Sequence, residues 1–438
     1  MFIVVLIEGF ISIGVEIFAI RQMVPYVGNN ILNTSIIIGV FLLFLSLGYY
    51  KGGLIKENFE EYLLNNLINS TILISFGLSS LFLSWHFSFF ENIGNLYGLI
   101  LFTFLIIAPI IYLLGQTIPI ITNFIKSSSN SKTNGTLLFL STLGSFLGSI
   151  ATSTLLLNFL GVNNTLFIYI LILLVLILIL VKHIKINKIY VIFRIVLIII
   201  ITFFVNSKTM YLYSNGYSSV KIKIDKSNVK YLDINNSFSS SYNQKIDNSS
   251  FKYILNLQEK IRNINTNEKK DILVVGAGGF TLSLKDKLNK YTYIDIDKDL
   301  KKYTEKYFLK KKINGDFIAD DIRFYFSNNK IKYDIIVLDA VSNRITIPPF
   351  LLTKNFFNQV KEHLKDDGVV LINFIGSPKF EDMYTKHFHQ TVSSKYNCMT
   401  EPIDFNKSLT NIIYFCVLKD DVIYTDNKIN IFELVNIK

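Results

Sequence analysis

The chain has 438 residues, of which half are apolar and only 18% are charged, whereas about 25% is usual for a soluble protein. Basic and acidic residues number nine and six in residues 1–206, but 35 and 27 in residues 207–438. The net charge of +11 therefore comes from scattered lysines and not from one basic stripe. This pattern argues against a nucleic-acid surface and indicates an apolar half joined to a polar half.

The cysteines and histidines are too few for a metal centre. Two cysteines, Cys398 and Cys416, exclude a disulfide framework and a cysteine-rich metal site. Cys416 lies in the apolar run "NIIYFCVLK", so we expect it in the core. His387 and His389 could form half of a metal site, but no cluster of ligands accompanies them. We expect no metal.

The first half contains seven apolar runs that reach or approach the roughly 20 residues a helix needs to cross a bilayer. We therefore predict a polytopic α-helical membrane domain over residues 1–206. The first run carries Glu8 and Glu16 and lacks a basic start and a small-residue cleavage site, so it is not a cleavable signal. The runs lie near residues 2–20, 31–50, 70–90, 97–123, 136–160, 164–181 and 190–206.

The lysines of this half fall in alternate connections between the runs, and the intervening connections hold only Arg21. The positive-inside rule places the lysine-bearing connections in the cytoplasm. Seven crossings would then put the second half outside, away from cytoplasmic nucleotides. Because Arg194 interrupts the last run, we expect that run to lie at the interface or to share a crossing. We predict six to eight spans in a bacterial inner membrane, with the second half cytoplasmic. The lysines are Lys51, Lys56, Lys126, Lys132, Lys182, Lys185 and Lys188.

A stripe of small residues follows one face of the fifth run. Ser141, Gly144, Gly148 and Thr152 recur at three- and four-residue spacing, which allows two helices to approach closely. Packing within the chain is favoured, and a homodimer face is the alternative.

Acidic residues in the first run have two interpretations. Glu8 and Glu16 share one helical face, and Arg21 follows just beyond. Ionisable groups inside a bilayer usually face a partner or a polar cavity. Two alternatives fit the sequence equally well. One is an ion pair between Glu16 and Arg21, and the other is a solute site.

The second half changes to strand patterns. Residues 207–250 alternate apolar and polar residues in "YSSVKIKIDKSNVKYLDIN", which predicts a small antiparallel sheet, and "SSSYNQKIDNSS" is expected to be a polar loop. Residues 251–438 start with the helical "FKYILNLQEKI" and then alternate strands with helices, which predicts a Rossmann-like α/β domain. The expected strands are "DILVVGA", "YTYIDID", "GDFIAD", "KYDIIVLDA" and "GVVLINFI", with "NIIYFCVLKD" as an antiparallel edge strand.

Glycines follow the first of these strands. "VVGAGGF" places Gly276, Gly278 and Gly279 in the expected strand-to-helix turn. Glycine there permits a tight turn and close approach of the backbone to a ligand, although many tight turns use glycine for other reasons.

Acids end the next two strands. Asp295 comes about twenty residues after the glycines, where an acid binds the two hydroxyls of a ribose. Asp320 and Asp321 end the third strand, and an acid there can accept from an adenine amino group. Each acid alone could cap a helix, but their order and spacing favour a nucleotide site. The third-strand acid favours S-adenosylmethionine or a relative over NAD.

The fourth strand runs into "LDAVSNRITIPPFLLTKNFF", in which Asp339 is followed by a long loop and a double proline. Asp339 could be a cap or turn residue. Alternatively, it is a carboxylate held over the ligand crevice, because such crevices lie at the carboxyl ends of the strands.

Residues 207–418 resemble the polyamine aminopropyltransferase (spermidine synthase) family in the order of the small sheet, "GAGG", "IDID", "ADD" and "LDAVSN…PPFLLTKNFF". The first half is similar to the membrane domain fused to bacterial spermidine synthase-like proteins. The resemblance implies a class I methyltransferase-type fold and a role in polyamine biosynthesis, in which decarboxylated S-adenosylmethionine gives an aminopropyl group to an amine. It also implies that Asp339 takes up the amine proton, that Asp295 binds ribose and that Asp320 binds adenine.

Some positions depart from the family pattern. Gly279 and Ser342 stand where the family has acids, and Phe251, Lys252 and Tyr253 replace its Tyr-His-Glu motif. Each lost charge-assisted hydrogen bond is worth about 1.5–3 kcal/mol, so diamine binding should be weak. Three functions follow as alternatives: aminopropyl transfer to an amine or other nucleophile, methyl transfer from S-adenosylmethionine, and a transporter or sensor that performs no chemistry.

Overall fold

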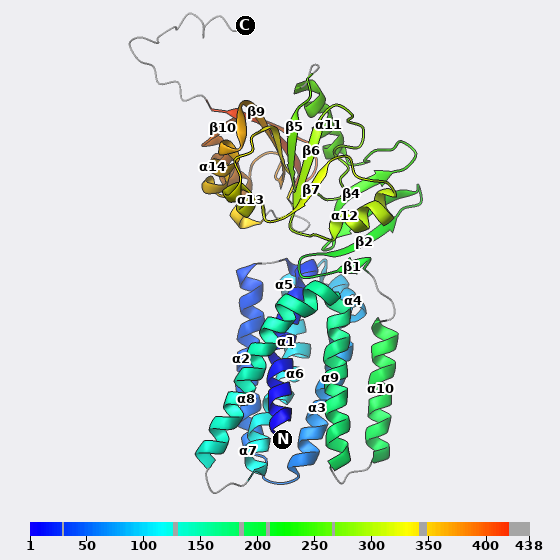
Figure 1. Cartoon of the computed structure of the whole chain (residues 1–438), viewed down its shortest axis with the longest axis vertical. Helices are drawn as coiled ribbons and strands as arrows, with labels where there is room; N and C mark the ends of the chain where they lie inside the picture. The colour runs from blue at the N-terminus through cyan, green and yellow to red at the C-terminus, as the bar shows by residue number, and fades with distance from the viewer. Residues whose placement is uncertain are drawn as a thin grey trace, which may run out of the picture. The chain divides into compact units, whose positions relative to one another are not determined.

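The computed structural model describes residues 1–28, 30–125, 130–183, 188–206, 211–264, 268–340 and 348–419. The chain forms two compact units, and the division between them falls after Ser239. The first unit contains the apolar helices and most of a small sheet, and the second contains a seven-stranded sheet with its helices (Figure 1).

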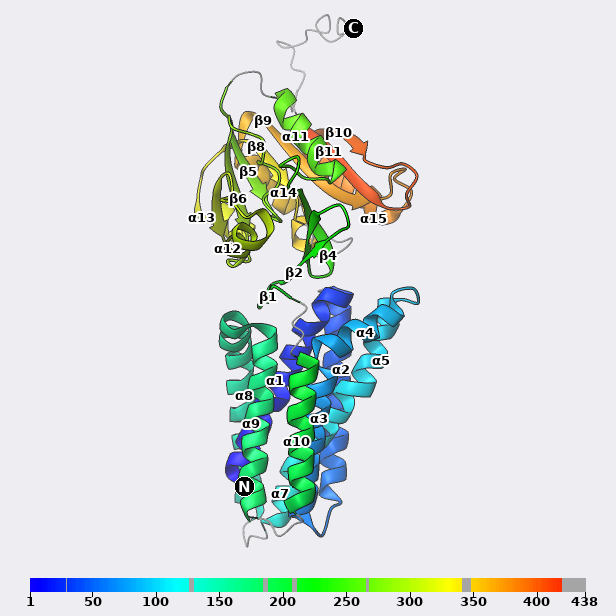
Figure 2. The same cartoon turned by 90° about the vertical axis from the view of Figure 1, so that its right-hand side faces the viewer.

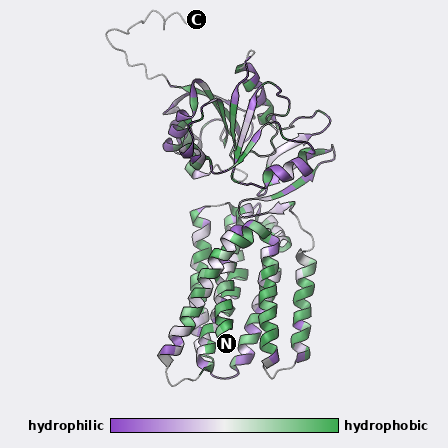
Figure 3. Ribbon diagram, viewed as in Figure 1, coloured by the Kyte–Doolittle hydropathy of each residue, from purple (hydrophilic) through white to green (hydrophobic). Residues whose placement is uncertain are grey.

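Helices occupy all seven apolar runs of the first half. Proline and π-helical turns interrupt several of them without ending the helical path. Figure 3 shows these helices as almost uniformly apolar. They are α1 Phe2–Val27, α2 Ile31–Gly53, α3 Phe59–Gly77, α4 Ser80–Phe90, α5 Asn95–Phe102, α6 Ala108–Gly115, α7 Thr117–Phe124, α8 Asn130–Ile150, α9 Gly161–His183 and α10 Lys188–Asn206.

Four helical stretches in the described residues are long and apolar enough to cross a membrane, or five if the bent pair α3 and α4 is one span. One of these stretches, Lys132–Lys182, includes both α8 and α9. The chain turns at Gly161, whose φ is 75°, and α8 and α9 run in opposite directions in Figures 1 and 2. The number of crossings between six and eight stays a prediction.

The small-residue stripe of α8 packs against α1. A Cβ atom on Gly144 or Gly148 would collide with the backbone of Leu6 or Phe10, so only glycine allows this approach. Thr152 bonds the hydroxyl of Tyr169 on α9 at 2.5 Å. The stripe therefore serves packing within the chain, as favoured from the sequence, and a homodimer remains a prediction.

The small sheet has the strand order β1-β2-β3-β4, with β2 antiparallel to β1 and β3. The antiparallel sheet was predicted, but the polar loop expected at "SSSYNQKIDNSS" was wrong at its start, which belongs to β4. Ser240 and Ser241 can be buried in a strand because their hydroxyl groups are hydrogen-bonded, Ser241 with Ser249 at 3.1 Å. The strands are β1 Tyr213–Ser214, β2 Ser219–Ile224, β3 Val229–Ile234 and β4 Ser237–Asn243.

The second unit has a mixed sheet in the order β10-β11-β9-β8-β5-β6-β7. The five strands from β9 to β7 are parallel, and β11 and β10 are antiparallel additions. This is the predicted Rossmann-like, class I methyltransferase-type fold. The strands are β5 Asp271–Val275, β6 Lys290–Asp295, β7 Asp316–Ala319, β8 Tyr333–Leu338, β9 Leu364–Gly376, β10 Tyr396–Pro402 and β11 Thr410–Leu418.

Two expectations about this sheet were wrong. The strand β11 is antiparallel but not at the edge, because β10 pairs along its outer side. No helix follows β5, although the sequence suggested one, and residues 276–289 form turns instead. The carboxylate of Asp286 accepts hydrogen bonds from the backbone of Leu288 and Asn289 at 2.9 and 3.1 Å, and this local bonding competes with a helix.

Helices lie in most other connections of the second unit (Figure 2), whereas residues 403–409 between β10 and β11 form turns. The amphipathic α11, predicted from its sequence, buries Ile254, Leu257 and Ile261. The helices are α11 Lys252–Ile264, α12 Leu300–Tyr303, α13 Ile322–Asn328, α14 Lys354–Glu362 and α15 Met383–Ser393.

Cys398 and Cys416 form a disulfide between the paired strands β10 and β11. Cys416 is fully buried, as expected for a core residue, but its pairing was not foreseen. The two residues are direct cross-strand partners, a relationship that depends on the register of the strands.

Candidate functional site

The parallel strands of the second unit end at one edge of the sheet. Val275 of β5 is in register with Ile294 of β6 and Leu338 of β8, and Asp295 is in register with Ala319 of β7. The residues that follow these positions are the glycine turn, the loop after Asp295, the acids after β7, and Asp339. Most of the predicted site residues are therefore brought to a single edge.

The glycine turn is shaped by close backbone contact. Gly276 and Gly278 have φ values of 90° and 49°, a region that glycine adopts without strain. A Cβ atom on Gly276 would collide with the carbonyl group of Asp339. Gly276 is thus required for the ends of β5 and β8 to approach each other.

Asp295 is fixed by backbone donors. Its Oδ2 accepts from the amide of Ala277 and its Oδ1 from the amide of Asp297, both at 3.0 Å. Burial raises the pKa of Asp295 to about 6, although these amide bonds act in the opposite direction. The carboxylate thus joins the glycine turn to the end of β6, and ribose binding by Asp295 remains a prediction.

The two acids after β7 have different surroundings. Asp321 caps α13, because its Oδ1 accepts from the amides of Arg323 and Phe324 at 2.9 and 3.1 Å. The carboxylate of Asp320 accepts a hydrogen bond from the amide of its neighbour Asp321 at 2.8 Å and does not cap the helix. Asp320 is therefore better placed than Asp321 for an adenine, and ligand binding by either acid remains a prediction.

Asp339 lies at the end of β8 between two side-chain donors. Asn373 donates to its Oδ1 at 2.7 Å, and the hydroxyl of Tyr253 lies 3.4 Å from its Oδ2. Burial raises the pKa of Asp339 to about 7, and both hydrogen bonds act to lower it. Burial and the nearby charge of Asp339 raise the pKa of Tyr253 well above 10, so Tyr253 stays protonated as a donor.

Sequence reasoning missed the residues that hold Asp339. Asn373 is a polar residue inside the buried strand β9, and it is only 2% exposed. Asn411 of β11 donates to Oδ1 of Asn373 at 2.8 Å, which orients the amide of Asn373 toward Asp339. A buried asparagine in the apolar run "GVVLINFI" was the available signal, since buried polar groups need partners.

Phe251, Lys252 and Tyr253, which stand in place of the Tyr-His-Glu motif, differ in their surroundings in the structure. Lys252 is exposed, whereas the Tyr253 hydroxyl faces Asp339. The Phe251 and Tyr253 rings are stacked with centroids 5.8 Å apart. Tyr253 therefore belongs with the residues around Asp339, although its position in the sequence suggested only a departure from the family pattern.

Gly279 has no space for a larger side chain. A Cβ atom there would lie 2.5 Å from a ring carbon of Phe308 and 2.7 Å from Cβ of Ser240. The amide of Gly279 donates to Oγ of Ser240 at 2.7 Å. Ser342, the other position where the family has an acid, lies outside the described residues.

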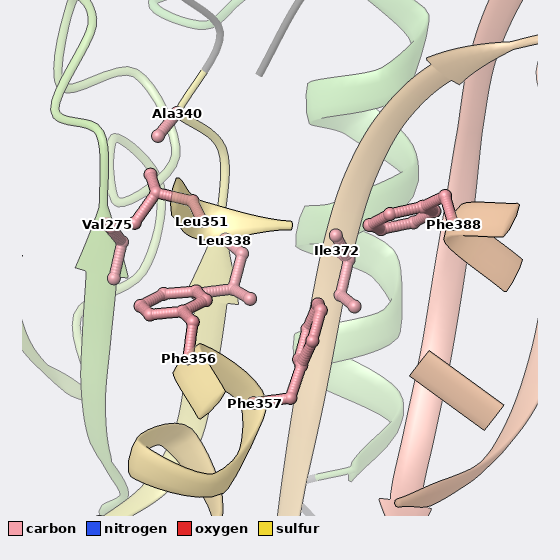
Figure 4. Close-up of a pocket in the computed structure, with 8 residues that line it drawn as sticks. All are labelled: Val275, Leu338, Ala340, Leu351, Phe356, Phe357, Ile372 and Phe388. Atoms are coloured by element: carbon pink, nitrogen blue, oxygen red, sulfur yellow. The ribbon is translucent and has the colours of Figure 1, made fainter. Parts of the chain in front are cut away.

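An apolar pocket lies beside Asp339 but does not have the lining of a polar substrate site. Figure 4 shows its side chains, which come from the ends of β5 and β8, the loop after β8, the interior of β9 and nearby helical segments. None of them could pair with an amine or a nucleoside hydroxyl. They are Val275, Leu338, Ala340, Leu351, Phe356, Phe357, Ile372 and Phe388.

Possible metal ligands do not gather in the part of the chain that the structure describes, where no three His, Cys, Asp or Glu side chains come together. The polar groups at the strand edge are carboxylates, amides and a phenol. Such groups can bind hydroxyl, amino and ammonium groups of a small molecule.

Comparison with known proteins bears on the same part of the chain. Residues 257–427 match the model of the spermine/spermidine synthase domain. The C-terminal half contains a spermidine synthase-like domain. A polyamine aminopropyltransferase of Vibrio vulnificus is 28% identical over 134 residues, which are 29% of this chain and 44% of that protein. A probable polyamine aminopropyl transferase of Bifidobacterium longum is 32% identical over 104 residues, 23% of each chain.

The chain thus spans less than half of the length of these two curated relatives. A probable spermidine synthase structure from Corynebacterium glutamicum is 18% identical, with a TM-score of 0.40 over 49% of this chain and 82% of that one. The spermidine synthase-like domain includes Asp295, Asp320 and Asp339, so the matched residues contain the whole strand edge described above.

Proposed function

We propose that the spermidine synthase-like domain binds decarboxylated S-adenosylmethionine or S-adenosylmethionine and transfers a group from it to an amine or other nucleophile. The observation that carries this proposal is the position of Asp339 at the strand edge, where Asn373 holds its carboxylate and its pKa is raised to about 7. Asp295 lies at the same edge, and the strands β8 and β6 that lead to the two acids flank β5. A base works best when its pKa lies near the operating pH.

The proposed chemistry assigns separate tasks to three acids. The carboxylate of Asp295 would accept hydrogen bonds from the ribose hydroxyls, while Asp320 would accept from the adenine amino group. The amine nitrogen attacks the carbon bound to the sulfonium, the carbon–sulfur bond breaks, and its electron pair remains on sulfur. Asp339 takes the proton released from the attacking nitrogen.

The turn after β5 supports a nucleoside without phosphate groups. Dinucleotide sites in related folds place a pyrophosphate at the amino end of the helix that follows the first strand. Here residues 276–289 form turns and offer no such helix. A sulfonium nucleoside has no phosphate and therefore does not need a helix at this position.

Methyl transfer is the second candidate, and Gly279 favours it. An acid at this position would hold the amine of an aminopropyl group, but Phe308 and Ser240 leave no space for a side chain. Intact S-adenosylmethionine, which keeps its own carboxylate beside its amine, does not require an acid there.

The products separate the candidates. The purified full chain is incubated with S-adenosylmethionine or with its decarboxylated form, in the presence of putrescine or an amine mixture. The nucleoside products are then identified by mass spectrometry. Methylthioadenosine indicates aminopropyl transfer, and S-adenosylhomocysteine indicates methyl transfer. If the chain binds a nucleoside but forms neither product, an enzymatic function is contradicted. That result would favour a sensor or transporter. Asp339→Asn is the control for chemistry that depends on the site.

The apolar helices support a further part of the proposal, that the chain is a multi-pass membrane protein. Their outward side chains include many large apolar residues that water would not favour, such as Leu42, Phe146, Leu171 and Phe203. The cytoplasmic position predicted for the C-terminal half depended on one apolar run not crossing the membrane, namely the run interrupted by Arg194.

A further inference from the structure

The helical bundle of the first unit, formed by α1 to α10, has two distinct ends. At one end, the side chain of Asn123 at the close of α7 donates to the carbonyl oxygens of Gly53 and Ile55, at 3.1 and 2.9 Å. Gly53 is the last residue of α2, and Ile55 lies in the connection from α2 to α3. This end, which we call the lysine end, carries Lys51 and Lys56 as exposed side chains.

The opposite end joins the close of α1 to the helices α4 and α5. Gln22 donates to the carbonyl oxygen of Leu78 at 3.0 Å, and the hydroxyl groups of Tyr26 and Ser84 are 3.1 Å apart. Asn95, at the start of α5, donates to the carbonyl oxygen of Tyr26 at 2.8 Å. We call this the far end.

The helix α10 runs from the lysine end to the far end. Arg194 bonds Asn65 at 2.7 Å and also Asn69, both in the middle part of α3. Eight residues further along α10, Thr202 bonds Ser75 at 2.7 Å near the close of α3. The later residue of α10 contacts the later residue of α3, so the two helices run in the same direction. Arg194 is satisfied by two asparagines within the bundle, which removes the reason to exclude this run from crossing.

The strands that follow α10 lie at the far end. The Nε of Arg21 donates to the carbonyl oxygen of Asn215 at 2.8 Å, and Asn236 donates to the carbonyl oxygen of Pro25 at 2.9 Å. Gly161, which begins α9, lies against the carbonyl oxygen of Ser214. The chain therefore leaves the bundle opposite the lysine end.

Positive charge is distributed unevenly between these ends. The far-end connections at residues 28–30, 91–94 and around Gly161 contain no lysine or arginine. Short connections rich in lysine remain in the cytoplasm, whereas long domains such as the one after α10 carry little weight in this rule. The lysine end should thus face the cytoplasm. Its exposed lysines in the described residues are Lys51, Lys56, Lys132, Lys182 and Lys188.

The disulfide is an independent observation in the second unit. Both cysteines of the chain are bonded to each other. Disulfides form and persist outside the cytoplasm and are rare in cytoplasmic proteins, where thiols are kept reduced.

We propose that the spermidine synthase-like domain lies outside the cytoplasm, on the side of the far end. No described residue after β1 belongs to a helix that could return the chain across the membrane. The inference rests on the membrane assignment proposed above and not on the chemistry proposed for Asp339. If both hold, the nucleoside and its acceptor must reach the site from outside the cytoplasm.

Thiol labelling in intact cells tests the orientation. Lys226, in the exposed turn between β2 and β3, is replaced in the full chain as Lys226→Cys, and the matched variant is Lys56→Cys at the lysine end. The two native cysteines are retained. A membrane-impermeant maleimide should label Lys226→Cys in intact cells and Lys56→Cys only after permeabilisation. The reverse pattern would overturn the proposal.

Denatured, unreduced protein gives a second measurement. The native chain should show no free thiol, and reduction should release two. Two free thiols before reduction would contradict an oxidising location. Because neither measurement involves catalysis, failure of the orientation and failure of the proposed activity would be seen separately.

Discussion

Asn373 of β9 donates a hydrogen bond of 2.7 Å to Asp339 at the end of β8, and Asn411 of β11 holds Asn373 in turn at 2.8 Å. Three neighbouring strands of the sheet thus contribute one side chain each to a chain of hydrogen bonds. This bond favours the charged form of Asp339, whereas burial opposes it.

The first prediction concerns the pH dependence of the rate. Asp339 acts as a base only when deprotonated, so kcat/KM should rise with pH and level off above about pH 7. Asn373→Ala removes a donor to the charged form, so the midpoint should move upward by about one pH unit, since one unit corresponds to about 1.4 kcal/mol. Asn411→Ala should move it in the same direction by less. An unchanged midpoint in both variants would contradict this positioning role.

Asp339→Asn tests the base itself. Asparagine keeps the shape of the side chain but cannot take a proton, so catalysis should fall about a hundredfold or more. Nucleoside affinity should hardly change, because ribose and adenine are bound elsewhere. In the native chain, folded Asp339 has a raised pKa and holds a proton that the unfolded chain releases, so the free energy of unfolding decreases as pH rises from about 4 to about 7. Asparagine does not ionise and avoids this loss. The stability of Asp339→Asn near pH 7 should therefore not fall below that of the native chain.

A matched control for this variant lies at the other end of the same strand. Asp334 pairs with Lys365 at 2.8 Å, away from the strand edge that carries the site. Asp334→Asn should leave the rate unchanged. A similar loss of rate in both variants would mean that Asp339→Asn acts through the strand and not through proton transfer.

Asp295→Ala should weaken nucleoside binding. Two charge-assisted hydrogen bonds to ribose are lost, each worth about 1.5–3 kcal/mol, so affinity should fall at least a hundredfold. Titration calorimetry at pH 8 measures this loss. With the native chain, affinity should also fall below about pH 6, because protonation removes acceptor capacity from Asp295. Asp321→Asn is the control, since asparagine caps a helix as well as aspartate. Equal affinity in Asp295→Ala and the native chain would remove ribose binding from this residue.

Gly279→Asp cannot restore the acid that the family has at this position. Its Cβ would lie 2.5 Å from the Phe308 ring, and overpacking of this kind costs about 1–3 kcal/mol. We expect a lower thermal midpoint for the full chain in detergent and no gain in putrescine transfer. The double variant with Phe308→Leu should recover part of the midpoint. A stable Gly279→Asp protein with new aminopropyl transfer would show that the turn can open.

The disulfide should stabilise the second unit. Its cysteines are 18 residues apart, and a loop of this size corresponds to about 3 kcal/mol. Replacement of both cysteines by serine should lower the thermal midpoint of the full chain. Dithiothreitol should lower the midpoint of the native protein to a similar extent and leave the double variant unaffected. An effect of dithiothreitol on the double variant would point to another cause.

The sequence predicted those parts of the fold that depend on local patterns. The buried strands before Asp295 and Asp339 were recognisable because apolar β-branched runs end abruptly at an acid. Pairing across the sheet was not recognisable, so the bonds of Asn373 with Asp339 and Asn411 were missed. The same limit hid the disulfide, since the register of β10 and β11 is a property of the fold. The turn at Asp286 was mistaken for a helix because its carboxylate bonds locally to the backbone.

The hydrogen bond from Gly279 to Ser240 has a practical consequence for shortened proteins. Ser240 precedes the helix α11 and the first strand of the Rossmann-like fold, yet its hydroxyl accepts from the amide of the glycine turn at 2.7 Å. A fragment that began at residue 251, where the sequence places the domain boundary, would leave that buried amide without its acceptor. A fragment made for crystallisation should therefore start upstream of β4, even though the strand–helix pattern of the Rossmann-like fold begins later.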